Sequence, residues 1–210
     1  MTIIDDFKFL KKHGFAPLPY ALARSEKEVV EAGKRIGYPL VLKVVSPEII
    51  HKTDVGGVII GIKNRKALRA AYNEIMENTR GKKVDGVLVQ KKARKGIELI
   101  IGGKKDEQFG HLVVIGLGGI YVEVFRDISA RICPISREDV KAMIMELKSH
   151  PIIMGTRGRR AIHIKSLEDL VLRICRFMER ENVSEMDLNP VIFNENGYDI
   201  IDVRFRRAGK

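Results

Sequence analysis

The sequence predicts a fold that combines helices with strands, many of them antiparallel. Three observations support this prediction. Apolar residues recur at helical spacing in several segments, of which residues 3–12 are the first. In other segments, such as 129–133, polar and apolar residues alternate, which is typical of antiparallel strands with one exposed face. Finally, Asn196-Gly197 stands between two apolar runs and predicts a β-hairpin.

In the first half, cap residues and glycines mark the ends of the predicted helices. Ser25 with Glu28 forms a capping box at the start of the second helix, and Gly37 ends it. Asn64 can cap the third helix. The predicted elements are helices over residues 3–12, 25–36 and 64–79, and strands near residue 20 and over 40–45, 58–62 and 86–90.

The second half is richer in strands. Ser136 with Asp139, and Ser166 with Asp169, predict capping boxes for its two helices. The predicted elements are helices over 136–147 and 166–181, and strands over 97–103, 111–119, 121–124, 129–133, 183–188, 191–193 and 198–203.

Composition narrows the class of protein. The 210 residues, 45% of them hydrophobic, suffice for one sizeable domain or two closely packed subdomains. Cys133 and Cys175 are the only cysteines, so we expect no disulfide framework, no metal-binding CxxC motif and a reducing, cytoplasmic location. The N-terminal segment lacks the apolar core of a signal peptide, and no apolar run is long enough to predict a membrane span.

The charge balance favours an anionic partner. With 38 basic and 27 acidic residues, the chain has a net charge of +11 and a pI near 9.7. Nucleic acid, nucleotide, coenzyme phosphate and an acidic partner subunit all fit this charge. Sparse aromatic residues and an even spread of the basic ones argue against a nucleic-acid-binding module, although a steep salt dependence of nucleic-acid binding would revive it.

The segment 38–58 carries the first candidate site. Lys43 interrupts an apolar strand, and the loop that follows ends in Gly56-Gly57. Adjacent glycines allow backbone N–H groups to approach an anion closely, and a lysine beside such amides often holds a polyphosphate. The alternative is a lysine that extends to solvent from a strand edge, next to an ordinary glycine turn.

A second candidate site lies near the C-terminus. The predicted hairpin brings the segment Asp187-Leu188-Asn189 close to Asp202. The oxygens of Asp202 and Asn189, and those of Asp187 as a further candidate, are ligands that Mg²⁺ prefers, with phosphates and water completing its octahedron. The alternative is a solvated acidic surface beside a hairpin.

Together these signals resemble the ATP-grasp superfamily. More closely, the chain is similar to the beta, nucleotide-binding subunit of the ADP-forming acetyl-CoA synthetases (acetate–CoA ligases), relatives of succinyl-CoA synthetase. The matching segments follow the family's order and are 39–43, 51–58, 86–90, 96–102, 109–110, 116–119, 157–158, 187–190 and 201–204.

The resemblance implies a two-subdomain α+β fold that holds ATP between two antiparallel sheets. The smaller subdomain would span residues 20–90, and the larger would span 91–210 with the helix 3–13 packed on it. The implied nucleotide contacts are Lys43 with the α- and β-phosphates, Gly56 and Gly57 in the covering loop, Gln90 and Lys92 in the adenine hinge, and Glu98 on the ribose side. Asn189 and Asp202 would hold Mg²⁺.

The resemblance also implies a phosphoryl relay through His51. The histidine of this loop would accept a phosphoryl group from a phosphohistidine on a partner alpha subunit and pass it to ADP, which suits a neutral imidazole near pH 7. The alternative is a loop histidine that only forms hydrogen bonds. The overall reversible reaction would convert acyl-CoA, ADP and phosphate into acid, CoA and ATP.

Three features limit these expectations. No GxGxxG fingerprint follows a strand, so CoA binding is assigned to the separate alpha subunit of an expected α2β2 enzyme. The hinge Gln90-Lys91-Lys92 lacks the acidic residue common beside adenine, which leaves ATP or GTP preference open. A stand-alone ATP-grasp carboxylate ligase is the alternative, but it would need an acceptor domain for which the chain has little room. We find no mechanism for Arg157-Gly158.

Overall fold

The computed structural model describes residues 3–119, 127–156 and 160–207. Contacts between Cα atoms divide the chain into two units, Leu18–Ala93 and a larger unit formed by Met1–Pro17 and Arg94–Lys210. The predicted strand at 121–124 lies outside the described residues, as does Arg157-Gly158.

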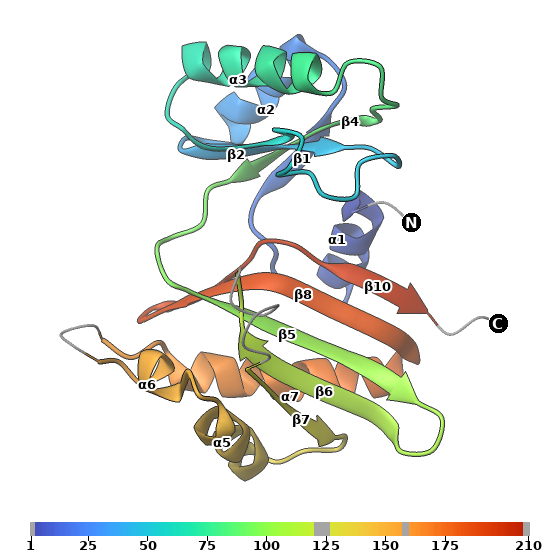
Figure 1. Ribbon diagram of the computed structural model, residues 1–210, viewed down its shortest axis with the longest axis vertical. Coiled ribbons are helices and arrows are strands. Elements are labelled where there is room, and N and C mark those ends of the chain that lie inside the picture. Colours follow the sequence, from blue (N-terminus) through green and yellow to red (C-terminus); the bar gives the residue numbers. More distant parts are fainter. Residues whose placement is uncertain (1–2, 120–126, 157–159, 208–210) are drawn as a thin grey trace. The chain divides into compact units, whose positions relative to one another are not determined.

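The smaller unit is a four-stranded antiparallel sheet with two helices on one face (Figure 1). The strand order is β1-β4-β2-β3. Buried residues from α2, α3 and the alternate positions of β2 and β4 form a single apolar core. Its elements are β1 (Tyr20–Ala23), α2 (Glu26–Ile36), β2 (Leu40–Val45), β3 (Val58–Ile62), α3 (Arg65–Asn78) and β4 (Gly86–Lys91).

The side-chain caps of α2 and α3 are in place. Ser25 Oγ accepts a hydrogen bond from the Glu28 N–H at 3.3 Å, and Asn64 Oδ1 accepts one from the Ala67 N–H at 2.9 Å. The capping box predicted for α2 is wrong in one half. The Glu28 carboxylate accepts from the N–H of Arg24, at 2.8 Å, and not from that of Ser25.

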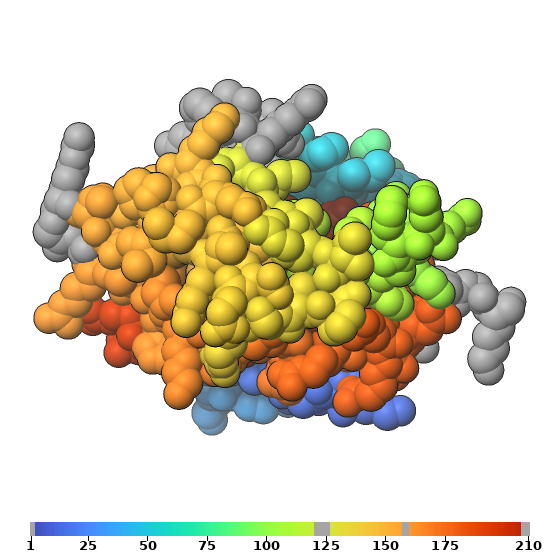
Figure 2. Space-filling model, turned by 90° about the horizontal axis from the view of Figure 1, so that it is seen from below, coloured from blue at the N-terminus to red at the C-terminus, as the bar shows by residue number. Residues whose placement is uncertain are grey.

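The larger unit is built on a six-stranded antiparallel sheet, with strand order β10-β8-β5-β6-β7 and β9 paired to β8. Helices α5, α6 and α7 lie on the same side of the sheet (Figure 1), and the segments of α5 and α6 dominate the face seen in Figure 2. Its elements are α1 (Ile3–Lys12), β5 (Ile97–Asp106), β6 (Gly110–Leu117), β7 (Ile128–Ile132), α5 (Arg137–Glu146), α6 (His150–Ile153), α7 (Ile164–Arg180), β8 (Val183–Asn194), β9 (Gly197–Ile200) and β10 (Arg204–Arg207).

Helix α1 attaches to the larger unit through aromatic side chains. Phe9 lies 5.7 Å from Phe177 of α7 and 5.4 Å from Phe205 of β10, measured between ring centroids. Aromatic pairs at this separation add to the free energy gained by burying the rings. None of the helices in the described ranges is both long and apolar enough to cross a membrane.

The capping box predicted for the last helix is wrong. Helix α7 begins at Ile164, and His163 is its N-cap, with Nδ1 accepting from the Ser166 N–H at 3.3 Å. Asp169 is instead bound to Arg137, which also donates to Glu168 at 2.9 Å. The Asp169 carboxylate, which the sequence pattern predicted as part of a cap, therefore forms an ion pair between α5 and α7 instead.

Strand β7 has the predicted alternation, but its apolar residues are the exposed ones. Ser129 Oγ donates to the Glu146 carboxylate of α5 at 2.6 Å, and Arg131 donates to the same carboxylate. Ile128 and Ile132 point the other way and are 55% and 48% exposed. Polar contacts, not apolar packing, therefore bind this strand to the helices.

The expectation of no disulfide is wrong. Cys133, directly after β7, and Cys175 of α7 form a disulfide with their Cα atoms 5.9 Å apart. Sequence spacing could not predict this contact, because the packing of α7 on the sheet creates it. Disulfides are rare in the cytosol of mesophiles but common inside hyperthermophilic cells, so the bond does not by itself exclude a cytoplasmic location.

Reducing the disulfide should lower the free energy of unfolding by about 4 kcal/mol, because the bond closes a loop with a sequence separation of 42 in the unfolded chain. Urea unfolding with and without a phosphine reductant measures the difference. The variant Cys133→Ala/Cys175→Ala should be insensitive to the reductant. Equal stability of the wild type under both conditions, or two free thiols in the unreduced denatured chain, would contradict the bond.

Candidate functional site

In the smaller unit, the sheet face opposite the helices carries two buried polar side chains. Leu42 and Val44 of β2 belong to the core against α2 and α3. Because successive strand residues face opposite sides, Lys43 lies on the other face, where it is 8% exposed. Gln90 of β4 shares that face and is 1% exposed, and neither side chain is without an interaction. A buried ammonium requires an anion or acceptors beside it, so this face suits contact with phosphates.

The loop between β2 and β3 presents His51 to solvent. After His51, hydrogen bonds within the loop fix the path of its backbone. The Gly57 N–H donates to the Lys52 carbonyl at 2.7 Å, and the Gly56 N–H donates to the Thr53 carbonyl at 3.1 Å. Both glycine amides are thus engaged inside the loop in this structure and do not form the open anion cradle that the glycine pair suggested.

The two glycines are nevertheless required by geometry. Gly56 has φ +63°, which disfavours residues with a side chain, and a Cβ at Gly57 would lie 2.6 Å from Val44 Cγ1. The Asn78 amide, at the end of α3, donates to the Gly56 carbonyl at 3.2 Å. The pair therefore shapes the loop that carries His51 and anchors it to β2 and α3.

The two lysines of the predicted adenine hinge, Lys91 and Lys92, have different environments. Lys91 Nζ donates to the carbonyls of Gly37 at 3.0 Å and Tyr38 at 2.7 Å, so it closes the end of α2. Lys92 has an exposed side chain, and its N–H donates to Pro39 at 3.0 Å. Gln90 and Lys92 are thus the predicted hinge residues whose side chains do not bind to the end of α2.

In the larger unit, the predicted acidic and amide groups lie on the sheet face away from α7. Leu99 and Ile101 are buried in the core, so Glu98 of β5 projects from the opposite face, where it is exposed. Asp187 of β8 lies between the buried Met186 and Leu188 and shares that face. The sheet thus has one apolar side and one side with carboxylates.

Asn189 of β8 and Asp202, which lies between β9 and β10, occupy neighbouring segments at one edge of the sheet. Val191 pairs with Ile200 of β9, and Asp187 pairs with Arg204 of β10. Continuing this register places Asn189 opposite Asp202, midway between the two pairs. The Ile201 N–H donates to the Pro190 carbonyl at 3.2 Å, in line with this register, so the two backbone segments run side by side here.

The electrostatics of this cluster favour a cation. Burial raises the pKa of the Asp187 carboxyl, and the neighbouring charges of Asp202 and Glu185 raise it further, while Arg204 and the Asn189 side chain lower it. Like charges held together in a partly buried place are relieved by a bound cation.

The residues present fit a Mg²⁺ ion that shares its coordination with phosphates. Within the described ranges, no three His, Cys, Asp or Glu side chains cluster as a complete metal site. Asn189 and Asp202 would supply two oxygen ligands, and Mg²⁺ usually keeps its remaining positions for phosphate oxygens and water. Two oxygen-bearing side chains would suit such a shared ion.

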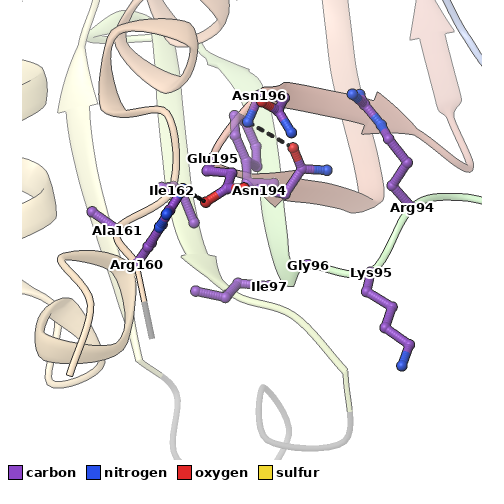
Figure 3. A pocket seen from close by; sticks show the side chains of 11 residues that line it. Arg94, Lys95, Gly96, Ile97, Arg160, Ala161, Ile162, Asn194, Glu195 and Asn196 are labelled. Carbon is purple, nitrogen blue, oxygen red and sulfur yellow. Dashed lines mark hydrogen bonds and ion pairs between the residues drawn. The ribbon is translucent and has the colours of Figure 1, made fainter. Parts of the chain in front are cut away.

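A cavity of about 660 Å³ lies elsewhere in the larger unit, and sequence reasoning did not predict it. An ion pair between Arg160 and Glu195, 3.1 Å long, stands beside it, while Lys95 points away from Asn194 (Figure 3). None of the predicted site residues lines this cavity. Its lining is Arg94, Lys95, Gly96, Ile97, Arg160, Ala161, Ile162, Phe193, Asn194, Glu195 and Asn196.

Fold and sites define the class of protein: the chain belongs to the ATP-grasp domain family, whose model matches residues 3–206. Among curated proteins it is similar to the beta subunit of acetate–CoA ligase [ADP-forming] I from Pyrococcus furiosus, with 41% identity over 202 residues, which is 94% of this chain and 87% of that subunit. It is also 43% identical over 200 residues to acetate–CoA ligase [ADP-forming] I of Archaeoglobus fulgidus, where those residues are 93% of this chain but only 29% of the relative.

Solved structures agree. Dinucleotide forming acetyl-coenzyme A synthetase 1 of Ca. Korarchaeum cryptofilum, in complex with coenzyme A, Ca-AMPCP and HgCl+, superposes with a TM-score of 0.92 at 40% identity, covering 99% of this chain and 93% of that one. Another structure of that protein (TM-score 0.86, 39% identity, 98% and 91% coverage) holds coenzyme A and Mg-AMPPCP, with its phosphohistidine segment pointing towards the nucleotide binding site. The predicted α+β ATP-grasp fold is thereby confirmed.

Proposed function

We propose that this chain is the nucleotide-binding subunit of an ADP-forming acyl-CoA synthetase, which converts acyl-CoA, ADP and phosphate reversibly into acid, CoA and ATP. The observation that carries this proposal is the likeness to a beta subunit over 94% of the chain. The burial of the Lys43 ammonium on its sheet face supports it, as does the oxygen-rich segment around Asn189 and Asp202, because phosphates need a cationic partner and Mg²⁺ needs oxygen ligands.

In this proposal the smaller unit supplies positive charge and shape. Lys43 contacts the α- and β-phosphates, and the loop shaped by Gly56 and Gly57 covers them. Gln90 and Lys92 line the adenine. Phosphoryl transfer requires mainly positioning and charge neutralisation from a protein, so a fixed lysine and a defined loop are sufficient contributions.

The larger unit supplies the ribose contact and the cation ligands. Glu98 accepts hydrogen bonds from the ribose hydroxyls, and Asn189 and Asp202 hold Mg²⁺. When bound, Mg²⁺ neutralises phosphate charge. The same cation is present with a nucleotide analogue in one solved relative, and the oxygen-rich cluster described above suits it.

His51 is the proposed phosphoryl carrier. A neutral imidazole nitrogen attacks the phosphorus of a phosphohistidine on the partner subunit, so that one P–N bond breaks as another forms. The phosphoryl group then passes to a terminal oxygen of ADP, which breaks the second P–N bond, makes ATP and restores the imidazole. Exposure of His51 on a loop fits delivery by another chain.

A separate chain is needed to complete this enzyme. The chain spans less than a third of the Archaeoglobus relative but most of the Pyrococcus beta subunit. We therefore propose a CoA-binding alpha partner, an α2β2 assembly and a cytoplasmic location. We also propose that residues 20–90, and 91–210 with the helix 3–13, act as the two subdomains.

Nucleotide binding can be tested on the chain alone. Mg²⁺ with ADP at 100 times its dissociation constant should add about 2.7 kcal/mol to the free energy of unfolding, because only the folded state binds it. Thermal unfolding with ADP, GDP and each with EDTA measures this and also compares the bases. The proposal predicts stabilisation that EDTA removes. No stabilisation by either nucleotide would contradict it.

A further inference from the structure

Arg94, where the chain enters the larger unit after β4, binds Asp199 of β9 through both its backbone and its side chain. Its N–H donates to Asp199 Oδ2 at 3.0 Å, its Nε donates to the same oxygen at 3.2 Å, and its Nη2 donates to Oδ1 at 2.7 Å. Nη2 also donates to the Tyr198 carbonyl at 3.4 Å. One residue thus occupies both oxygens of a carboxylate whose side chain is only 8% exposed.

These bonds fix the backbone of the segment as well as a side chain. A guanidinium that binds both oxygens of a carboxylate has a defined orientation, and charge-assisted hydrogen bonds are stronger than neutral ones. Gly96 adds a second fixed point, because a Cβ there would lie 2.2 Å from the Phe193 carbonyl oxygen of β8. The segment from Arg94 to Gly96 therefore lies directly against the β8–β9 hairpin.

The segment just before Arg94 is held within the smaller unit. The Lys91 N–H donates to the Pro19 carbonyl at 2.8 Å, and the Lys92 N–H donates to that of Pro39. Ala93 follows directly and is the last residue of this unit. Fixed contacts thus stand on both sides of Ala93, so the backbone between the proposed adenine hinge and β5 has a defined path.

The other connection between the units is held by the same strand. Pro17, the last residue of the N-terminal part of the larger unit, forms an isolated parallel bridge with Ile200 of β9. Ile200 is fully buried and follows Asp199 in the chain. A change at the Asp199 carboxylate should therefore loosen the Arg94 segment while the bridge at Pro17 stays in place.

We infer that Arg94 and Asp199 are positioning residues for the nucleoside part of the nucleotide. This inference rests on the proposed function. The proposed adenine contacts, Gln90 and Lys92, come just before Arg94, and the proposed ribose contact, Glu98, comes soon after it. The ion pair orders the segment between these contacts before the nucleotide binds, which lowers the entropy cost of binding. Neither Arg94 nor Asp199 contacts the nucleotide itself.

The test compares ADP with inorganic tripolyphosphate, which has phosphates but no nucleoside, in calorimetric titrations of the full chain with Mg²⁺. Asp199→Asn should weaken ADP binding about tenfold and leave tripolyphosphate binding within about twofold of the wild type. Arg94→Met should do the same. The double variant should lose no more than either single variant, because both changes break one ion pair.

The matched control is Lys95→Met, which removes a positive charge from the exposed side chain next to Arg94. It should leave both affinities unchanged. Thermal unfolding without ligand shows that each variant is folded. Asp199→Asn keeps the shape of the buried side chain and one acceptor oxygen, so it tests the inference even where Arg94→Met does not fold.

Four results would overturn the inference. Asp199→Asn could leave ADP affinity unchanged, or the losses in the double variant could multiply. ADP and tripolyphosphate could weaken equally, which would mean that the pair stabilises the whole site and not the nucleoside contacts. Lys95→Met could weaken ADP binding as much as Arg94→Met, which would make charge the cause. A wild-type chain that binds no ADP would instead contradict the proposed function, and that result is distinct from these four.

Discussion

Replacing His51 with alanine should lower ATP formation from acyl-CoA, ADP and phosphate by at least about 1,000-fold in the assembled enzyme. Removing a nucleophile that forms a covalent intermediate leaves no alternative route through the same site. His51 is exposed on its loop, so the substitution should not disturb the core. A coupled assay of ATP formation, with the partner subunit present, measures the loss.

The matched control for His51 is Asp54→Asn, which changes an exposed side chain of the same loop. It should keep activity within a few-fold of the wild type. The His51→Ala chain should also keep its ADP affinity, because the proposed role is phosphoryl transfer and not nucleotide binding. A His51→Ala enzyme that retains more than a tenth of the activity would exclude the relay.

Replacing Lys43 with methionine should weaken ADP binding about 10- to 100-fold. Hydrogen bonds from a charged group contribute about 1.5–3 kcal/mol each, and Lys43 is the buried cation on its sheet face. Methionine keeps most of the volume and removes the charge, so the fold should remain stable. Calorimetric titration with ADP and Mg²⁺ measures the change.

The control for Lys43 is Lys63→Met, an exposed lysine just after β3. Its ADP affinity should match that of the wild type, even though both variants lose one positive charge. Equal weakening in the two variants would show that only the net charge of +11 attracts the nucleotide. Unchanged affinity in Lys43→Met would remove Lys43 from the site.

Periodicity and turn signals predicted most of the elements, because each is a local property. The hairpin at Asn196-Gly197 is present, with Asn194 paired to Gly197. The predicted break at Pro190 is not present, and β8 continues through it. The register with β5 shifts between Leu99 and Ile101 at this point, which accommodates a residue without an N–H.

Two of the misses depend on contacts between distant segments. Asp169 was expected to cap α7 but binds Arg137, which is 32 residues earlier. The Cys133–Cys175 bond depends in the same way on how α7 packs. No local pattern contains such information, since each pairing is set by the docking of one element on another.

In the candidate site, too, the sequence predicts some features and not others. A lysine inside an apolar strand and oxygen ligands beside a hairpin are visible in sequence, and Lys43, Asn189 and Asp202 therefore remain the predicted site residues. The engagement of both glycine amides within the His51 loop is not visible, because it depends on carbonyls that the folded loop supplies.

The measurement that tests the proposed function most directly is ³²P labelling of this chain. The chain, its alpha subunit, acetyl-CoA and labelled phosphate are mixed, and acid-labile, base-stable label is followed on each subunit. The relay predicts such label on the wild-type chain and none on the His51→Ala chain. Label that reaches the alpha subunit but never this chain, in a complex shown to assemble, would contradict the relay. Absence of label from both subunits would contradict the synthetase itself and favour a stand-alone ligase.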